Sequence, residues 1–240
     1  MFTQYHELEP MSVGRTKFED RRVPWQKPTM QSDLFSGDET VAIPGLRYQP
    51  EFLSPEEEAR LLDVIRTLPL HPAKYKEYLA RRQVVSFGGS YDFDTHTLRP
   101  GKVLDERLEP LRDRVAAWMS EPRDQLVQVL VAEYAPGTPL GWHRDVPDFE
   151  TIAGVSLGNA ATLRFRPYPP DDAAKRHAVQ LEVAPRSIYM MSGAARWAWQ
   201  HCVPPVAERR WSITLRTPRR RVQQRSAAPD GIRSPMFHER

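Results

Sequence analysis

Residues 141–145, with the sequence GWHRD, and residues 199–203, with the sequence WQHCV, carry the side chains on which the interpretation of this chain depends. They supply His143, Asp145 and His201: a histidine, a carboxylate two positions later, and a distant second histidine. Two imidazoles and one carboxylate on one octahedral face can hold iron(II) and leave the opposite positions open for oxygen chemistry. Because side chains on a strand alternate between faces, we expect His143 and Asp145 to point the same way from one strand. His201 must then come from a neighbouring strand, as in a closed or double β-sheet.

A later segment, RWSITLR at residues 210–216, alternates polar and apolar side chains. A half-exposed strand with its polar side in water would show the same pattern. Alternatively, Arg210 and Arg216 face inward across about 20 Å of strand and bind both ends of a five-carbon dicarboxylate. Guanidinium groups suit carboxylates because one group can contact both oxygens. The strand alone does not decide, but the predicted iron triad upstream favours the dicarboxylate.

Composition limits the class of protein. The chain has 240 residues, 40% of them hydrophobic, with 23 prolines against 12 glycines, which fits one medium domain with tails. Cys202 is the single cysteine, so an internal disulfide is impossible and a reducing compartment is favoured. No apolar run approaches the ~20 residues that cross a bilayer, and the N-terminus lacks the layout of a secretion signal. We expect a monomeric cytoplasmic protein that does not enter membranes.

The net charge of +3 is concentrated at the C-terminus. Residues 217–240 contain six arginines and two acidic residues, so the rest of the chain is close to −1. A basic tail can bind phosphates without specificity, although such tails are commonly solvated and disordered. The high pI is therefore weak support for a nucleic-acid protein.

The first half of the chain contains two helix signals. Residues 1–40 mix charges, prolines and isolated aromatics without a period, and we expect them to be mostly extended or disordered. A core strand is expected near Val41. Residues 54–57, Ser-Pro-Glu-Glu, are typical of a helix N-terminus, and this helix should end before Pro69. A second amphipathic helix is predicted over residues 105–119. The apolar stripe of the first helix consists of Leu61, Leu62, Ile65 and Leu68.

The second half has the pattern of a β domain. From residue 126 onward, short strand-like runs are separated by Gly, Pro, Asn and Asp, with no helix-length segment between them. Between the helices, residues 81–99 contain aromatics and a glycine pair, which predict a hairpin or lid rather than a core strand. We therefore predict an α+β fold: a double-stranded β-helix (jelly-roll) core over residues 41–217, buttressed by N-terminal helices. Residues 1–40 and the basic segment 218–240 would be flexible tails.

Other interpretations of these motifs are weaker. An isolated H-x-D triplet occurs by chance, and most histidines are surface or hydrogen-bonded core residues. The H-R-D triplet does not indicate a kinase, because position 150 is Glu150 where a catalytic loop needs asparagine, and a glycine-rich phosphate loop is absent from the sequence. A structural zinc site at Cys202 is improbable with one cysteine in the chain.

Residues 126–217 resemble the catalytic core of AlkB-type iron(II)/2-oxoglutarate dioxygenases. The segment 81–99 is also similar to the nucleotide-recognition lid of that family. Taken together the ordered motifs are specific, and the arginine pair distinguishes this family from most other facial-triad oxygenases. The matching signature is Tyr134-x-x-Gly137, His143-x-Asp145, Ser156-Leu-Gly158, His201 and Arg210-x5-Arg216.

The resemblance implies roles for these residues and shows two departures. It implies that the triad binds iron(II), with 2-oxoglutarate and dioxygen as co-substrates. Ala132 stands where family members often have an asparagine, which affects a co-substrate hydrogen bond. Pro147 stands where some repair members have an acidic residue that reads the base, although Asp148 lies next to it. The residues implied to bind 2-oxoglutarate are Leu130, Tyr134, Arg210, Ser212 and Arg216.

The function implied is oxidative demethylation of N-alkylated nucleobases, such as 1-methyladenine and 3-methylcytosine, in single-stranded or damaged DNA or RNA. The alternatives are a hydroxylase or demethylase of a protein or a modified RNA nucleoside, and a jelly-roll binding protein without catalysis. The complete triad and arginine pair argue against the last. A base must leave its stack to reach such a site, so aromatic side chains should receive it. The candidates, each of which could instead be ordinary packing, are Phe87, Tyr91, Phe93 and Trp142. Arg81, Arg82 and Arg99 flank the lid and could neutralise phosphates or simply be solvated.

Overall fold

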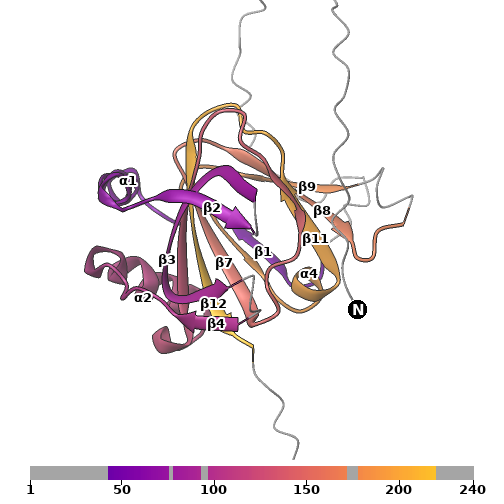
Figure 1. Ribbon diagram of the computed structural model, residues 1–240, viewed down its shortest axis with the longest axis horizontal. Helices are drawn as coiled ribbons and strands as arrows, with labels where there is room; N and C mark the ends of the chain where they lie inside the picture. Colours follow the sequence, from indigo (N-terminus) through magenta and orange to yellow (C-terminus); the bar gives the residue numbers. More distant parts are fainter. Residues whose placement is uncertain (1–42, 76–77, 93–96, 172–177, 220–240) are drawn as a thin grey trace, which may run out of the picture. The chain divides into compact units, whose positions relative to one another are not determined.

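Two antiparallel sheets form the framework of this protein in the computed structural model (Figure 1). The model describes residues 43–75, 78–92, 97–171 and 178–219, which all belong to one compact unit. The larger, eight-stranded sheet has the order β1-β10-β7-β12-β5-β3-β2, with β4 paired to β3. The smaller, four-stranded sheet has the order β6-β11-β8-β9. This arrangement confirms the predicted jelly-roll core.

The strands of the larger sheet are β1 (Leu46–Gln49), β2 (His71–Tyr75), β3 (Tyr78–Asp92), β4 (Thr97–Pro100), β5 (Gln128–Tyr134), β7 (Phe149–Leu157), β10 (Ile188–Met191) and β12 (Arg210–Pro218). The strands of the smaller sheet are β6 (Leu140–His143), β8 (Ala161–Pro167), β9 (Val179–Val183) and β11 (Trp199–Val203). The helical elements are α1 (Pro55–Thr67), η1 (Glu106–Leu108), α2 (Glu109–Met119), η2 (Arg123–Gln125) and α4 (Gly193–Trp197).

Helix α1 forms as its sequence predicts. The Ser54 side chain accepts a hydrogen bond from the Glu57 backbone, and the Glu57 carboxylate accepts one from the Ser54 backbone, which completes a capping box. Leu61 and Ile65 are buried on the face that contacts the sheet. The second predicted helix is divided into the short turn η1 and the helix α2, which ends at Ser120 in the left-handed conformation.

The larger sheet has two different faces, and this difference positions the functional site. One face packs against α1 and α2 through residues such as Val85, Val129 and Val131 (Figure 1). The other face turns toward the smaller sheet, where Ala132 and Tyr134 pack with residues such as Phe165. Successive side chains along one strand therefore point alternately into the helix-packed core and into the space between the sheets.

Several details differ from the sequence prediction. Residues 83–88 of β3 pair with β5 inside the larger sheet, so this part of the predicted lid is a core strand. Its side chains alternate between the two buried faces. The following residues, 89–92, pair with β4 as a hairpin, as expected. The first strand described is β1 rather than a strand at Val41, which lies outside the described residues. The predicted tail 1–40 also lies outside them, as do residues 220–240 of the predicted tail 218–240, whereas Pro218 is the last residue of β12. Among the described helices, none combines the length and apolarity needed to cross a membrane.

Candidate metal centre and co-substrate pocket

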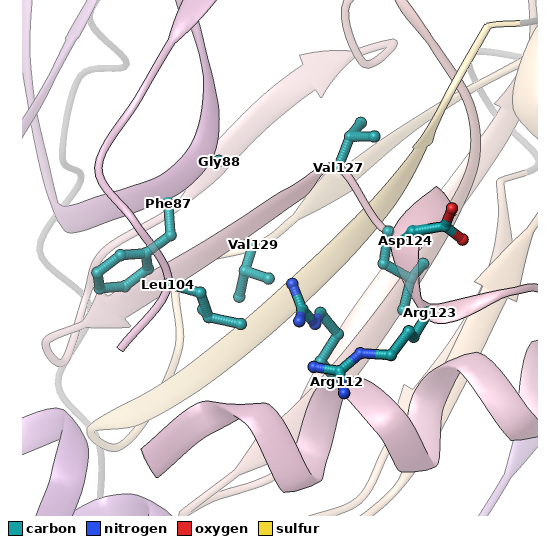
Figure 2. Close-up of a pocket in the computed structure, with 9 residues that line it drawn as sticks. Phe87, Gly88, Leu104, Arg112, Arg123, Asp124, Val127 and Val129 are labelled. Atoms are coloured by element: carbon teal, nitrogen blue, oxygen red, sulfur yellow. The ribbon is translucent and has the colours of Figure 1, made fainter. Parts of the chain in front are cut away.

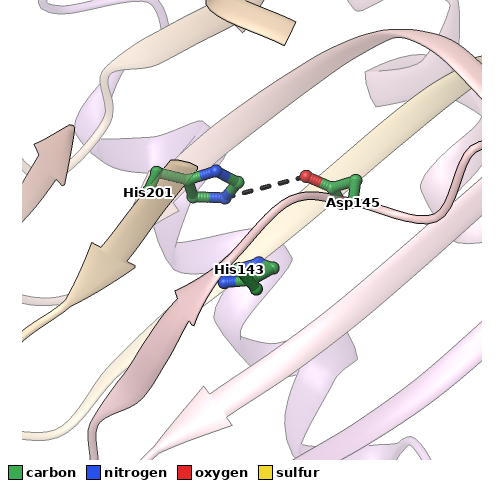
Figure 3. A group of neighbouring side chains, drawn as sticks. All are labelled: His143, Asp145 and His201. Carbon is green, nitrogen blue, oxygen red and sulfur yellow. Dashed lines mark ion pairs between the residues drawn. The ribbon is translucent and has the colours of Figure 1, made fainter. Parts of the chain in front are cut away.

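Three side chains from two strands and one loop meet between the sheets (Figure 3). His143 is the last residue of β6 and pairs directly with His201 in β11, so their imidazole centroids lie 4.2 Å apart. The Oδ2 atom of Asp145 is 3.7 Å from Nε2 of His201. One potential ligand atom from each residue lies within 4.8 Å of the others. A single metal ion could contact all three, which confirms the predicted convergence.

The protonation states of these groups suit a divalent metal. The Nδ1 atom of His143 lies 2.9 Å from the carbonyl oxygen of Gly141; because a carbonyl only accepts, Nδ1 carries the proton and Nε2 is left for the metal. Burial lowers the pKa of His143, and burial together with His143 lowers the pKa of His201 to about 3. Burial opposes ionisation of Asp145, but the neighbouring Arg216 guanidinium and the histidines hold its pKa well below the ordinary value. At neutral pH the triad is therefore two neutral imidazoles and one carboxylate, the forms that bind metals.

Arg216 occupies the metal-proximal end of the predicted arginine pair. Its Nη2 and Nε atoms donate to Oδ1 of Asp145 at 2.8 and 3.3 Å, which leaves Oδ2 directed toward His201. Its Nη1 atom donates to Oε1 of Gln128 at 3.0 Å, and the Gln128 amide donates onward to the carbonyl oxygen of Gly89. Arg216 therefore orients the metal carboxylate, a contact that the sequence did not predict. Gln128 shares the inward face of β5 with Leu130 and Tyr134, so strand periodicity could have indicated it.

Arg210 lies at the opposite end of β12 and is almost completely buried. Its Nη2 atom donates to Oγ of Ser156 at 2.9 Å, and its guanidinium lies 5.2 Å from the ring centre of Tyr134. The Nε atom is buried without an acceptor among the described residues. A buried cationic donor without a partner is costly, and the carboxylate of a bound diacid would supply the missing acceptor. The residues present therefore fit 2-oxoglutarate between Arg216 and Arg210.

The remaining predicted co-substrate residues line the same inward face. Ser212 and Thr214 lie between the two arginines on β12, opposite Ala132 and Leu130 of β5. Their polar side chains therefore face the space between the sheets rather than water, which favours the second of the two interpretations of the alternating strand. Tyr134 is buried at the end of β5, beside Arg210.

Arg82 joins this pocket, although the sequence suggested only that it flanks the lid. Its Nη1 atom donates to the hydroxyl of Tyr134 at 3.4 Å, and its Nε atom is buried without a partner among the described residues. Burial favours the neutral phenol of Tyr134, but the guanidinium groups of Arg82 and Arg210 bring its pKa below the ordinary value. The pocket is therefore strongly electropositive around Tyr134.

Of the four predicted base contacts, only Phe87 and Trp142 have described side chains, and these two are not brought together. Phe87 is buried on the helix-packed face, where it lines a cleft of about 520 Å³ with residues such as Leu104 and Val129 (Figure 2). Phe87 lies opposite Val129 of β5, on the side of the sheet away from the iron triad. Inward and outward positions alternate along β3, and the face that Phe87 occupies could not be predicted from the sequence. Trp142 is half-buried beside the Arg166 guanidinium, 4.3 Å from its ring centre. The backbone of Tyr91 belongs to the β3–β4 hairpin, and Phe93 lies outside the described residues.

Fold and site together define an iron(II)- and 2-oxoglutarate-dependent oxygenase. The chain belongs to the 2OG-Fe(II) oxygenase superfamily, whose sequence profile matches residues 45–225. His143, Asp145 and His201 are its iron-binding H-x-D…H triad.

Proteins similar to the chain include AlkB homologues, which confirms the resemblance seen in the sequence. It is 29% identical over 188 residues to the Arabidopsis thaliana alkylated DNA repair protein ALKBH8 homolog, covering 70% of this chain and 53% of that protein. It is 28% identical over 171 residues to the Mus musculus tRNA (carboxymethyluridine(34)-5-O)-methyltransferase ALKBH8, covering 68% of this chain and 24% of that protein. The chain thus spans about half of the first relative and a quarter of the second. The solved structure of OsALKBH1 has the same fold, with a TM-score of 0.57 at 15% identity over 72% of this chain and 97% of that chain.

Proposed function

We propose that this protein oxidises an alkyl group on a nucleobase in single-stranded nucleic acid. The first candidate reaction is oxidative demethylation of an N-alkylated base, in which the hydroxylated methyl group leaves as formaldehyde. The observation that carries the oxygenase chemistry is the triad, with His201 buried and His143 and Asp145 half-buried, facing the arginine pair on β12. The nucleic-acid substrate is supported by the relatives, whose names refer to alkylated DNA repair and to tRNA.

In this reaction, separate side chains bind the metal, keep its carboxylate ligand ionised and bind the co-substrate. When bound by His143, Asp145 and His201, iron(II) supplies oxygen activation coupled to decarboxylation of 2-oxoglutarate. Arg216 keeps Asp145 ionised and aimed at the metal, and Arg210 anchors the far carboxylate of the co-substrate. Buried apolar side chains between the sheets, such as Phe165, limit the access of water to this chemistry.

A second candidate is oxidation of a modified RNA nucleoside with a neutral base, and the charge of the pocket favours it. 1-Methyladenine and 3-methylcytosine are cationic at neutral pH. Arg82 adds a third guanidinium beside Tyr134, while Pro147 replaces the acidic residue that some family members carry. Like charges repel strongly in a buried site, so a neutral base with carbonyl acceptors is easier to accommodate. The carboxymethyluridine in the name of the mouse relative has a neutral ring with carbonyl acceptors and a carboxylate substituent, so it carries no positive charge.

Mass spectrometry distinguishes the two candidates. Oligonucleotides with 1-methyladenine or 3-methylcytosine, as DNA and as RNA, and tRNA with modified wobble uridines would be incubated with iron(II), ascorbate and 2-oxoglutarate. Loss of 14 mass units per methyl group indicates demethylation, and gain of 16 indicates a stable hydroxylated product, as the atomic composition of each reaction requires. The Asp145→Ala variant is the control for non-enzymatic oxidation. If none of these nucleic acids changes mass or stimulates succinate release, the nucleobase proposal is wrong.

A further inference from the structure

The backbone at Asp145 is not held by a strand. Strand β6 ends at His143, which is paired with His201 of β11, and β7 begins at Phe149. Residues 144–148 form the loop between them. The alternation of side chains along a strand, from which the position of Asp145 was predicted, therefore does not apply to Asp145. Another contact must fix this loop so that the carboxylate meets the two imidazoles.

Arg196 of helix α4 supplies that contact. Its Nη2 atom donates to the carbonyl oxygens of Asp145 at 3.1 Å and Val146 at 2.7 Å, and its Nε atom donates to that of Phe149 at 3.2 Å. The side chain is 3% exposed, so these carbonyl groups take the place of water around the guanidinium. One planar fork thus spans the whole loop, from the metal ligand to the first residue of β7.

Further contacts join the same two segments in both directions. Arg144 donates to the carbonyl oxygen of Trp197 at 3.1 Å, and the indole of Trp197 donates to Glu150 at 2.9 Å. The Arg196 guanidinium also lies 4.3 Å from the centre of the Trp197 ring. Helix α4 and β11 are joined by the single residue Ala198. The turn that holds the Asp145 loop is therefore continuous with the strand that carries His201.

Burying the Arg196 guanidinium costs free energy because the charged group loses its hydration. This cost indicates that the side chain does more than fill space. Burial lowers the pKa of Arg196, and three neutral carbonyl groups compensate for lost hydration less well than a carboxylate would. An apolar side chain could fill the same volume, but it could not donate to three carbonyl groups in different directions. The positive charge also lies near Asp145 and favours its ionised form.

We infer that Arg196 is a positioning residue for the iron site: it holds the backbone of Asp145 in the ligand position before the metal binds. Its role differs from that of Arg216, which contacts the carboxylate itself. The hydrogen bonds of Arg196 go to main-chain carbonyl groups of the loop, and its guanidinium packs against the Trp197 ring. The inference rests on the iron triad and does not depend on which nucleic acid is oxidised.

The test is metal affinity measured without turnover. Co(II) binding to wild type, Arg196→Met and Arg196→Lys would be followed by visible absorption in the absence of 2-oxoglutarate and nucleic acid. Losing a group that orients a metal ligand typically weakens metal binding about 10- to 100-fold, and we expect that loss for the methionine variant. The lysine variant should lie between, because one ammonium group keeps the charge but cannot reach all three carbonyl groups. Saturating iron(II) should restore most of the succinate-forming rate.

The matched control is Arg166→Met. Arg166 also has its guanidinium beside a tryptophan, but it contacts Trp142 and Gln200, which lie outside the Asp145 loop. Circular dichroism shows which variants fold. A folded Arg196→Met protein with wild-type Co(II) affinity, or one whose activity is lost at every iron concentration, overturns the inference. If the methionine variant does not fold, the same two outcomes in the lysine variant decide it.

Discussion

The co-substrate wall and the metal-bearing loop are built by different means, although they meet at Asp145. The wall consists of inward positions on β5, β7 and β12, paired over long continuous registers. The loop of residues 144–148 lies outside the strand ladders. Apart from a main-chain hydrogen bond from Arg219 to Asp148, it is held by side chains from α4 and β12. In the wall, the main-chain hydrogen bonds between strands determine the direction of each side chain. In the loop, the position of Asp145 depends on contacts with the buried side chains of Arg196 and Arg216.

This difference determines how each region should respond to substitution. A strand position keeps its direction when its side chain is removed, because the main-chain hydrogen bonds persist. Removing Arg210 should therefore take away a ligand contact without moving its neighbours. The loop lacks that support, so removing Arg216 or Arg196 should change the position of another residue, Asp145. Substitutions that separate these outcomes test the comparison.

The largest effect is expected from Asp145→Ala. The substitution removes one of three metal ligands and leaves the buried Arg216 without its carboxylate partner. We expect metal binding and 2-oxoglutarate turnover to be abolished. Co(II) titration and succinate release measure the two properties. Asp148→Ala is the control, because it removes a neighbouring carboxylate of the same loop that is outside the triad; measurable turnover in Asp145→Ala would refute the metal assignment.

The arginine pair should give the next largest effect, and the two members should differ. Truncating one partner of a buried charge pair typically costs about 2–5 kcal/mol, so Arg210→Met should raise the KM for 2-oxoglutarate on the order of 100-fold. Its Co(II) affinity should remain that of wild type. Arg216→Met should raise the same KM and also weaken Co(II) binding, because Asp145 loses both guanidinium contacts. If both variants lose metal affinity equally, the wall is not independent of the loop.

The sequence predicted the wall well because a period of two residues carries the direction of each side chain. The inward set Arg210, Ser212 and Arg216 could be recognised from alternation alone once the triad upstream suggested what they face. The capping box of α1 could be predicted for a similar reason, since all its atoms come from neighbouring residues. Both signals are local and need no knowledge of distant segments.

The loop could not be predicted in the same way. Arg196 is 51 residues from Asp145, and no spacing rule connects a guanidinium with three carbonyl groups that distant. The prediction that Phe87 contacts the base was wrong for a related reason. Its burial is expected from its residue type, but the face of β3 to which it points depends on the register with β5. Long-range pairing, rather than residue type, determined both outcomes.

A smaller effect should appear in the stability of the metal-free protein as a function of pH. The pKa of His201 is lowered from 6.5 to about 3, and that of His143 is also lowered, so the folded protein does not take up the protons that the unfolded chain binds. Stability should therefore fall as pH decreases from about 7 to about 3. The lowered pKa of Asp145 steepens the acid end of this decline. Urea unfolding at several pH values measures the slope.

The dependence of stability on pH can be tested with the variant His201→Gln and the control variant His71→Gln. His71 is exposed on β2, so its replacement should leave the dependence as in wild type. Replacing His201 removes one group that resists protonation and should make the decline shallower. An identical slope in the two variants would show that the His201 ring is not kept neutral by its surroundings.

The smallest effect on the site is expected from Ser54→Ala, which acts on neither region. The substitution removes the hydroxyl that accepts from the Glu57 backbone at the start of α1, and loss of such a cap typically costs about 1 kcal/mol of stability. Helix α1 packs on the outer face of the larger sheet, while the wall and the loop lie on its inner side. The urea midpoint should therefore fall while Co(II) affinity and the KM for 2-oxoglutarate stay at wild-type values. A change in either binding constant would mean that the outer face transmits strain to the site, and the independence assigned to the wall would have to be abandoned.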